Sequence, residues 1–252
     1  MRQSLRRLLT LTAALALSAA AHAEVVQVAV AANFTAPARA LAEIFAKTTG
    51  HEAKLSFGAT GAFYTQIKNG APFDVLLAAD DERPIRLDKE GDTVPGSRFT
   101  YATGKLVLWS AKPGFVDDQG AVLKGGNFGK LAIANPKNAP YGAAAVQTMD
   151  KLGLTAAIQP KLVTGESIGQ TYNFIATGNA DLGFVAMAQV LEGGKLKGGS
   201  MWVVPAQYHE PIIQDAVILK RAANNPAAKA WMELLQKPQT KEFIRTYGYD
   251  VK

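Results

Sequence analysis

Residues 25–35 read Val-Val-Gln-Val-Ala-Val-Ala-Ala-Asn-Phe-Thr, and this stretch decides the fold class. Its first seven residues are rich in β-branched side chains and have the length of a buried strand. The apolar residues that follow have the spacing of one helix face: Ala38, Leu41, Ile44 and Phe45. This pattern ends at Gly50. The segment therefore predicts a strand that leads directly into a helix.

The same alternation continues along the chain. A half-buried strand over 53–57, a helix over 61–69 and a buried strand over 73–78 favour a mostly parallel sheet with helices on both faces. After a break at 100–104 the alternation restarts, with strands or helices predicted at 105–110, 131–134, 141–152, 168–177 and 181–185. The predicted fold class is therefore α/β, with two lobes.

The tail of the chain holds two extended stretches, 201–204 and 216–219, and then two helices. Asn225 followed by Pro226 is typical of a helix start, because Asn caps the first turn and proline suits the first helical position. The periodicity leaves open to which lobe this tail returns.

Composition and charge exclude several classes of protein. The chain has 252 residues, no Cys and three His, which excludes disulfides, thiolate metal sites and thiol nucleophiles. Residues 1–23 have the pattern of a secretory signal peptide with cleavage after Ala23, and the apolar run 8–17 is shorter than the ~20 residues that a membrane anchor needs. Three of the 27 basic residues lie in this segment, so the remaining chain has 24 basic and 21 acidic residues and a net charge of +3. We therefore expect a soluble monomer exported to the periplasm that does not bind nucleic acid.

The sequence offers little catalytic equipment. Beyond the signal peptide only His51 and His209 remain, and no GxSxG, HExxH, phosphate-loop or GxGxxG motif occurs. We expect no enzyme and no cofactor, although a periplasmic hydrolase that uses Asp80 or Glu166 stays an alternative.

A strand that ends in a small or polar turn and opens into a helix occurs four times. The first turn of a helix has free backbone N–H groups and the positive end of the helix dipole, so it favours anions. Four such turns between two lobes would form a small anion pocket, whereas taken singly each could be an ordinary helix cap. The four turns are 31–35, 57–61, 135–142 and 164–169.

Three of these turns and two further segments resemble the substrate-binding proteins of molybdate ABC importers. The resemblance covers residues 24–249, with all segments in order. It implies a periplasmic binding protein of type II, with lobes formed by 24–103 plus 206–252 and by 104–205, and with hinge crossings near Thr103 and Pro205. The segments that carry it are Ala31-Ala32-Asn33-Phe34-Thr35, the turn around Thr60-Gly61, Gly70 to Val75 with Ala79-Asp80, Ala139-Pro140-Tyr141-Gly142 and Gly178 to Val185.

The resemblance also implies a set of uncharged donors for the anion. By motif, Asn33 would give its side-chain amide and backbone N–H, and Thr60 its hydroxyl and N–H. Many members of the family have a tyrosine where this chain has Ala186, so we expect the Tyr141 hydroxyl to replace it. The implied site residues are Asn33, Thr60, Tyr141 and Ile168, with Gly61 and Ala186 as further candidates and no direct protein ligand to the metal.

The implied function is capture of molybdate, and of tungstate, for an inner-membrane ABC permease and its ATPase. A carrier of sulfate or another tetrahedral oxyanion stays the alternative. The size of the cavity decides between these anions, and the sequence does not give that size. A site built only from donors should discriminate against phosphate, which still carries a proton at neutral pH and needs an acceptor.

Overall fold

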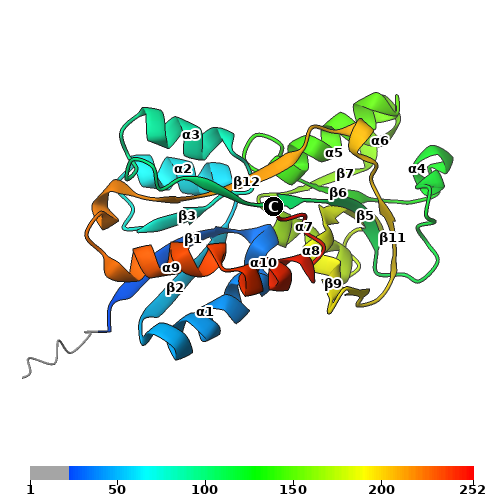
Figure 1. The fold of residues 1–252 in the computed structure, drawn as a ribbon. Coiled ribbons are helices and arrows are strands. Elements are labelled where there is room, and N and C mark those ends of the chain that lie inside the picture. Colours follow the sequence, from blue (N-terminus) through cyan, green and yellow to red (C-terminus); the bar gives the residue numbers. More distant parts are fainter. Residues whose placement is uncertain (1–22) are drawn as a thin grey trace, which may run out of the picture.

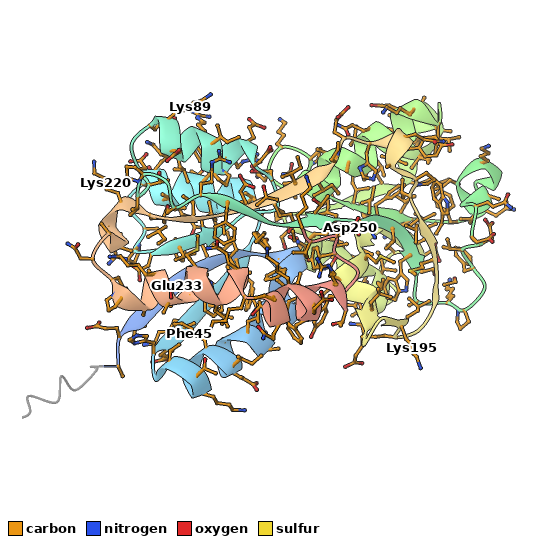
Figure 2. The ribbon with its side chains drawn as sticks, in the orientation of Figure 1. Phe45, Lys89, Lys195, Lys220, Glu233 and Asp250 are labelled. Atoms are coloured by element: carbon orange, nitrogen blue, oxygen red, sulfur yellow. The ribbon has the colours of Figure 1, made fainter. Side chains whose placement is uncertain are left out.

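The computed structural model describes residues 23–252, so the signal peptide predicted for residues 1–23 lies outside the described residues except for Ala23. Two lobes lie side by side, each with a five-stranded sheet between helices (Figure 1). In Figure 2, Phe45 and Glu233 mark the first lobe, Lys195 marks the second, and Asp250 lies where the two meet. This architecture confirms the predicted two-lobed α/β fold class.

The first lobe is built from both ends of the described chain. Its sheet has the strand order β2-β1-β3-β12-β4, and β12 is antiparallel to both of its neighbours. The elements are β1 (Val25–Ala31), η1 (Ala32–Phe34), α1 (Thr35–Thr49), β2 (Glu52–Gly58), α2 (Thr60–Lys68), β3 (Val75–Leu77), α3 (Glu82–Lys89), β4 (Phe99–Gly104), β12 (Ile212–Ile218), η4 (Lys220–Ala222), α9 (Pro226–Gln236) and α10 (Pro238–Arg245).

The second lobe contains the middle of the chain. Its sheet has the order β11-β5-β8-β6-β7, and here β5 is the reversed strand, so each sheet is mostly parallel as predicted. The elements are β5 (Leu106–Ser110), α4 (Ala121–Gly125), β6 (Leu131–Ala134), α5 (Pro140–Lys151), α6 (Thr155–Ile158), η2 (Gln159–Lys161), β7 (Leu162–Gly165), α7 (Ile168–Ala176), β8 (Leu182–Ala186), α8 (Met187–Val190), β9 (Leu191–Glu192), β10 (Lys195–Leu196), β11 (Ser200–Val203) and η3 (Ala206–Tyr208).

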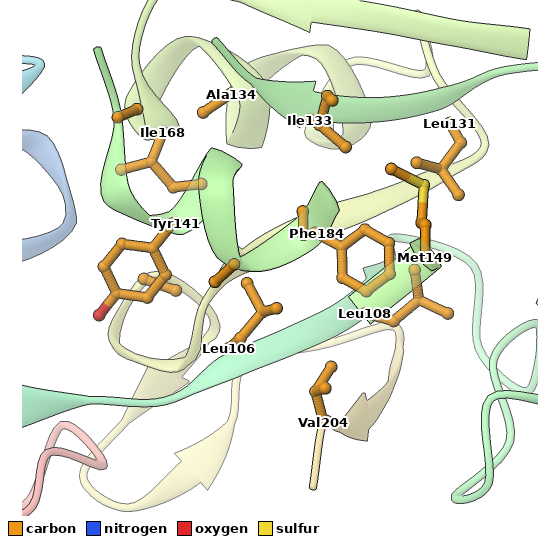
Figure 3. Packing of buried hydrophobic residues seen from close by; sticks show 14 of the residues in the cluster. Leu106, Leu108, Leu131, Ile133, Ala134, Tyr141, Met149, Ile168, Phe184 and Val204 are labelled. Atoms are coloured by element: carbon orange, nitrogen blue, oxygen red, sulfur yellow. The ribbon is translucent and has the colours of Figure 1, made fainter. Parts of the chain in front are cut away.

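Alternating side chains of the strands separate two apolar layers in each lobe. In the first lobe, Val28 and Val30 pack with α1 and α9, whereas Ala29 between them packs with α2 and α3. In the second lobe the layer on the α5 side includes Phe184 and Met149, and Figure 3 shows Tyr141 and Ile168 at the other end of this cluster. The cores thus hold the helix starts that follow β6 and β7 against the sheet.

The chain passes between the sheets at two places. One is Lys105, between β4 and β5, and the other is the segment 204–211, between β11 and β12. Near the first passage the backbone of Thr103 exchanges two hydrogen bonds with Asp250, so the end of the chain packs against it.

One predicted boundary is wrong. Residues 100–104 were expected to form a break, but they belong to β4, an edge strand of the first sheet. The partner of β4 is β12, more than 100 residues later, and a pairing of that range leaves no local signal.

The predicted start of α9 is confirmed, since Asn225 Oδ1 accepts from the N–H groups of Ala227 and Ala228 and Pro226 is the first helical residue. None of the helices between residues 23 and 252 combines the length and the apolar character that a membrane crossing requires.

Candidate anion-binding site

The four strand-to-helix turns meet around one small cavity between the lobes. The cavity has a volume of about 10 Å³, roughly the room of a single bound water. The first lobe contributes the ends of β1, β2 and β3, and the second lobe contributes the starts of α5 and α7. The lining residues are Ala31, Ala32, Asn33, Gly58, Ala59, Thr60, Ala79, Ala139, Pro140, Tyr141 and Ile168.

Thr60 presents a hydroxyl proton that is free to be donated. Its Oγ1 accepts a hydrogen bond of 3.0 Å from the backbone N–H of Ala79, and the side chain is buried. The Thr60 hydroxyl donates to no acceptor among residues 23–252. Thr60 is also the first residue of α2 and does not cap it, so its side chain is not needed for the helix. The hydroxyl is thereby oriented by one local bond and has its proton left for a ligand.

Asn33 lies in the same cavity but has its amide protons engaged. Its Nδ2 donates to Gln214 Oε1 at 2.9 Å and to Tyr249 Oη at 3.0 Å, which uses both protons. The side chain is 2% exposed, and its Oδ1 makes no hydrogen bond with the described part of the chain. Asn33 does not cap a helix either. The structure thus places Asn33 at the site and leaves an unpaired carbonyl oxygen where an amide donor was expected.

Backbone N–H groups supply further donors. Thr60, Tyr141 and Ile168 stand in the first turns of α2, α5 and α7, where no residue one turn earlier in the helix can accept from them. Within residues 23–252 these three N–H groups, and that of Asn33, donate to no protein acceptor. The side chain of Ser167 caps α7 by accepting from the N–H of Gln170. That cap leaves the N–H of Ile168 available on the cavity side.

The Tyr141 hydroxyl belongs to a buried hydrogen-bond cluster. It accepts from Gln214 Nε2 at 3.0 Å, and Tyr101 Oη lies 3.0 Å from Gln214 Oε1 and from the carbonyl oxygen of Ala78. Burial raises the pKa of Tyr141, and it raises the pKa values of Tyr101 and Tyr249 well above 10. All three hydroxyls therefore stay neutral at physiological pH.

Sequence reasoning missed Gln214, Tyr101 and Tyr249. Gln214 is completely buried in strand β12, next to the equally buried Asp215, and the other residues of the strand are apolar. A buried amide in such a strand needs hydrogen-bond partners, and this mismatch is the one signal that the sequence contained. The partners of Gln214 come from β4, η1 and α5, and Tyr249 joins the cluster through Asn33, so no local pattern could identify them.

Two of the predicted residues lie outside the lining. The N–H of Gly61 donates to the carbonyl oxygen of Asn138 at 2.9 Å, so it serves a contact between the lobes. Ala186 is buried at the end of β8, and its N–H donates to Gln189 Oε1. Gln189 Nε2 in turn donates to the carbonyl oxygen of Ile168 and so fixes the start of α7. The position of Ala186 therefore supports the site only through its neighbour.

Charged side chains stand outside the cavity. No residue in the lining of the described structure is charged. On one side a groove of about 450 Å³ holds Asp80 and Arg83, which form an ion pair of 2.5 Å, and on the other a groove of about 380 Å³ holds Arg39 and Lys197. Burial raises the pKa of Asp80, and the nearby Arg83 opposes that rise. Glu166, the other candidate acid, is exposed and absent from the lining.

Hydrogen bonds across the cavity's edge hold the two lobes together. Arg83 Nη2 donates to the carbonyl oxygen of Lys137 at 2.8 Å, beside the bond from Gly61 to Asn138. Behind the cavity lining, Gln214 on β12 donates to Tyr141 on α5. The lobes are therefore closed on the cavity. No group of three or more His, Asp or Glu between residues 23 and 252 could hold a metal ion directly.

Comparison with known proteins places the chain in a family. Residues 26–250 match the family model of the bacterial extracellular solute-binding proteins. The chain is 61% identical over 249 residues to the molybdate-binding protein ModA of Azotobacter vinelandii, covering 99% of both proteins, and 56% identical over 241 residues to that of Rhodobacter capsulatus, covering 96% and 93%. The solved periplasmic molybdate-binding protein of Azotobacter vinelandii superposes with a TM-score of 0.87 at 46% identity, covering 90% of this chain and 99% of that one. The chain belongs to the bacterial extracellular solute-binding proteins and groups there with the molybdate-binding proteins.

Proposed function

We propose that this protein captures molybdate in the periplasm and delivers it to the permease and ATPase of an ABC importer, and that it also accepts tungstate. The observation that carries the proposal is the uncharged cavity on which four helix-start turns from two lobes converge. Its close relatives are named for molybdate binding, and none of those compared above is named as an enzyme.

Neutral dipoles suit a tetrahedral dianion. The free N–H groups of Asn33, Thr60, Tyr141 and Ile168 and the Thr60 hydroxyl are fixed by the fold before the anion arrives. A buried Lys or Arg would itself be costly to desolvate, whereas helix N-termini offer positive potential without that cost. Hydrogen bonds to a charged group contribute roughly 1.5–3 kcal/mol each. A handful of such bonds is enough for tight binding.

Closure of the lobes completes the site. The donors of Asn33 and Thr60 come from the lobe that we assign to 24–103 plus 206–252, and those of Tyr141 and Ile168 from 104–205. The two passages, next to Thr103 and Pro205, act as the hinge. The protein works as a monomer without a resident cofactor, and the closed, loaded form is what the permease recognises.

The alternative of a periplasmic hydrolase that uses Asp80 or Glu166 is less well supported. Asp80 is paired with Arg83, and neither His51 nor His209 lines the cavity. No nucleophile next to a general base is therefore present at the place where a substrate would sit.

A panel of anions tests the proposal. Titration calorimetry with molybdate, tungstate, sulfate and phosphate should show tight 1:1 binding of the first two and much weaker binding of phosphate. Phosphate binding as tight as molybdate binding would overturn the donor-only site, and tighter sulfate binding would reassign the cargo. Small-angle scattering with and without molybdate should show a more compact loaded form.

A further inference from the structure

The carboxamide of Asn33 faces the cavity with an atom that has no partner. Its Oδ1 is buried and unpaired in the described structure, although a buried polar atom without a hydrogen bond is costly. Both amide protons are engaged by Gln214 and Tyr249. In this state Asn33 offers the cavity an acceptor, which suits a protonated oxyanion and repels a dianion.

Gln214 determines this orientation because it meets Asn33 with its oxygen. Gln214 Oε1 lies 2.9 Å from Asn33 Nδ2 and 3.0 Å from Tyr101 Oη, while its Nε2 lies 3.0 Å from Tyr141 Oη. A carboxamide has nearly the same shape when its nitrogen and oxygen exchange places. Turning both amides by 180° therefore keeps the contacts of Gln214 with Asn33, Tyr101 and Tyr141. In each of these hydrogen bonds the donor and the acceptor exchange roles.

The reversed arrangement gives hydrogen-bond partners to Gln214, Tyr101 and the Asn33 amide oxygen. Tyr249 Oη, which donates to the backbone carbonyl oxygen of Asn33 in the structure, then lies beside Asn33 Oδ1 and can donate to it instead. Gln214 Nε2 then donates to Asn33 Oδ1 and to Tyr101 Oη, and Tyr101 donates to the carbonyl oxygen of Ala78, 3.0 Å away. Gln214 Oε1 accepts from the Tyr141 hydroxyl. Asn33 Nδ2 takes the place of the unpaired oxygen, and its protons are free for the anion.

On the basis of the proposed function, we propose that Gln214 is a positioning residue that sets oxyanion specificity. In the molybdate-loaded protein the Asn33 and Gln214 amides are both turned, so that Asn33 presents its NH₂ group to the cavity. Gln214 does not touch the anion. It selects fully ionised oxyanions by holding the amide of Asn33 in the donor orientation, and it links that choice to Tyr141 on the opposite lobe.

Nuclear magnetic resonance on the intact mature protein, with ¹⁵N-labelled Gln, tests the turn directly. In the structure Gln214 Nε2 lies beside Tyr141, and after the turn it lies beside Tyr101. With saturating molybdate we expect nuclear Overhauser contacts from the Gln214 side-chain protons to the Tyr101 ring. Persisting contacts to the Tyr141 ring in the loaded protein would overturn the proposal. If molybdate does not bind at all, the proposed function fails instead.

Substitution of Gln214 tests the effect on specificity. In Gln214→Glu, the hydroxyls of Tyr101 and Tyr141 and the amide of Asn33 can donate to the carboxylate and keep it ionised. The carboxylate cannot donate to Asn33, so Oδ1 stays toward the cavity. Sulfate and phosphate have similar shapes but differ in their proton, and we expect the ratio of phosphate to sulfate affinity to rise about tenfold or more.

Gln214→Met is the matched control, because it keeps the length of the side chain and has neither a strong donor nor a strong acceptor. It frees Asn33 to turn toward the anion, so this ratio should change by less than about threefold. A purely structural role of Gln214 predicts equal losses for both anions in both variants. An unchanged ratio in Gln214→Glu would therefore overturn the proposal.

Discussion

Asn33 and Thr60 follow neighbouring parallel strands of one sheet, and both are almost completely buried at the same cavity. They differ in how their protons are used. Thr60 is oriented by the N–H of Ala79, 19 residues away, and keeps its proton, whereas Asn33 spends both amide protons on residues 181 and 216 positions away. One donor is ready as soon as the first lobe folds. The other depends on a cluster that includes β12 and Tyr141 of the opposite lobe.

Gly104→Ala should have the largest effect, because it disrupts the hydrogen-bond cluster around Asn33 and does not touch Thr60. A Cβ at Gly104 would lie 2.0 Å from Tyr141 Oη and 2.5 Å from Gln214 Nε2, so both side chains must move. With the cluster broken, Asn33 loses the partners that orient its amide and Tyr141 is displaced at the start of α5, so the molybdate Kd should rise roughly 100-fold or more by calorimetry. Gly198→Ala, which meets no atom within 4 Å, is the control. A Kd within about threefold of the parent protein would show that the site does not depend on the cluster.

Thr60→Val should weaken molybdate binding by about 10–100-fold, because a hydrogen bond to a charged ligand is worth roughly 1.5–3 kcal/mol. It also leaves the N–H of Ala79 without its acceptor, so chemical unfolding without the anion should show a loss of about 1–3 kcal/mol. Thr60→Ser keeps the hydroxyl and should retain most of the affinity. Full affinity in the Val variant, which keeps the methyl group and lacks the hydroxyl, together with a loss in the Ser variant, would mean that the methyl group, and not the donor, matters.

A double-mutant cycle measures whether the two donors differ as described. Asn33→Ala alone should cost about 10–100-fold in molybdate affinity, and in a Gln214→Glu background, where Asn33 presents its oxygen to the cavity, its cost should shrink by about fivefold or more. Thr60→Val should cost the same in both backgrounds to within about 0.5 kcal/mol. Additivity for Asn33 and Gln214 would erase the distinction between the two donors.

The smallest effect concerns pH. Burial holds the pKa values of Tyr101 and Tyr249 well above those of an unfolded chain, whose tyrosines ionise near 10. Above about pH 10 the folded protein thus binds more protons than the unfolded chain, and the free energy of unfolding should fall as pH rises. Between about pH 7 and 9 neither state titrates at these residues, so molybdate affinity and these contributions to stability should stay constant.

Urea unfolding at several pH values checks this prediction. Tyr249→Phe should reduce the alkaline loss of stability, because it removes one of the hydroxyls concerned. If the free energy of unfolding falls by the same amount in the parent protein and in Tyr249→Phe as pH rises, other groups are responsible for the loss.

Much of the fold could be predicted from local patterns. The strands at β1 and β2 and the helices that follow them came from alternation, helical spacing and turn residues such as Gly50 and Gly70. The strand β4 was missed because its partner is β12, and all residues of the second lobe lie between these two strands in the sequence. The start of α9 was predictable because an N-cap is decided by neighbouring residues.

The sequence by itself predicted four strand-to-helix turns with free N–H groups, and the family resemblance of its motifs implied Asn33, Thr60, Tyr141 and Ile168 as site residues. Each of these features depends on residues close together in the chain. Only the tertiary structure decided which protons remain free. Hydrogen bonds such as those of Asn33 to Gln214 and Tyr249 depend on distance and angle in space, and residues about 200 positions apart reach that geometry only when both ends of the chain fold together into the first lobe.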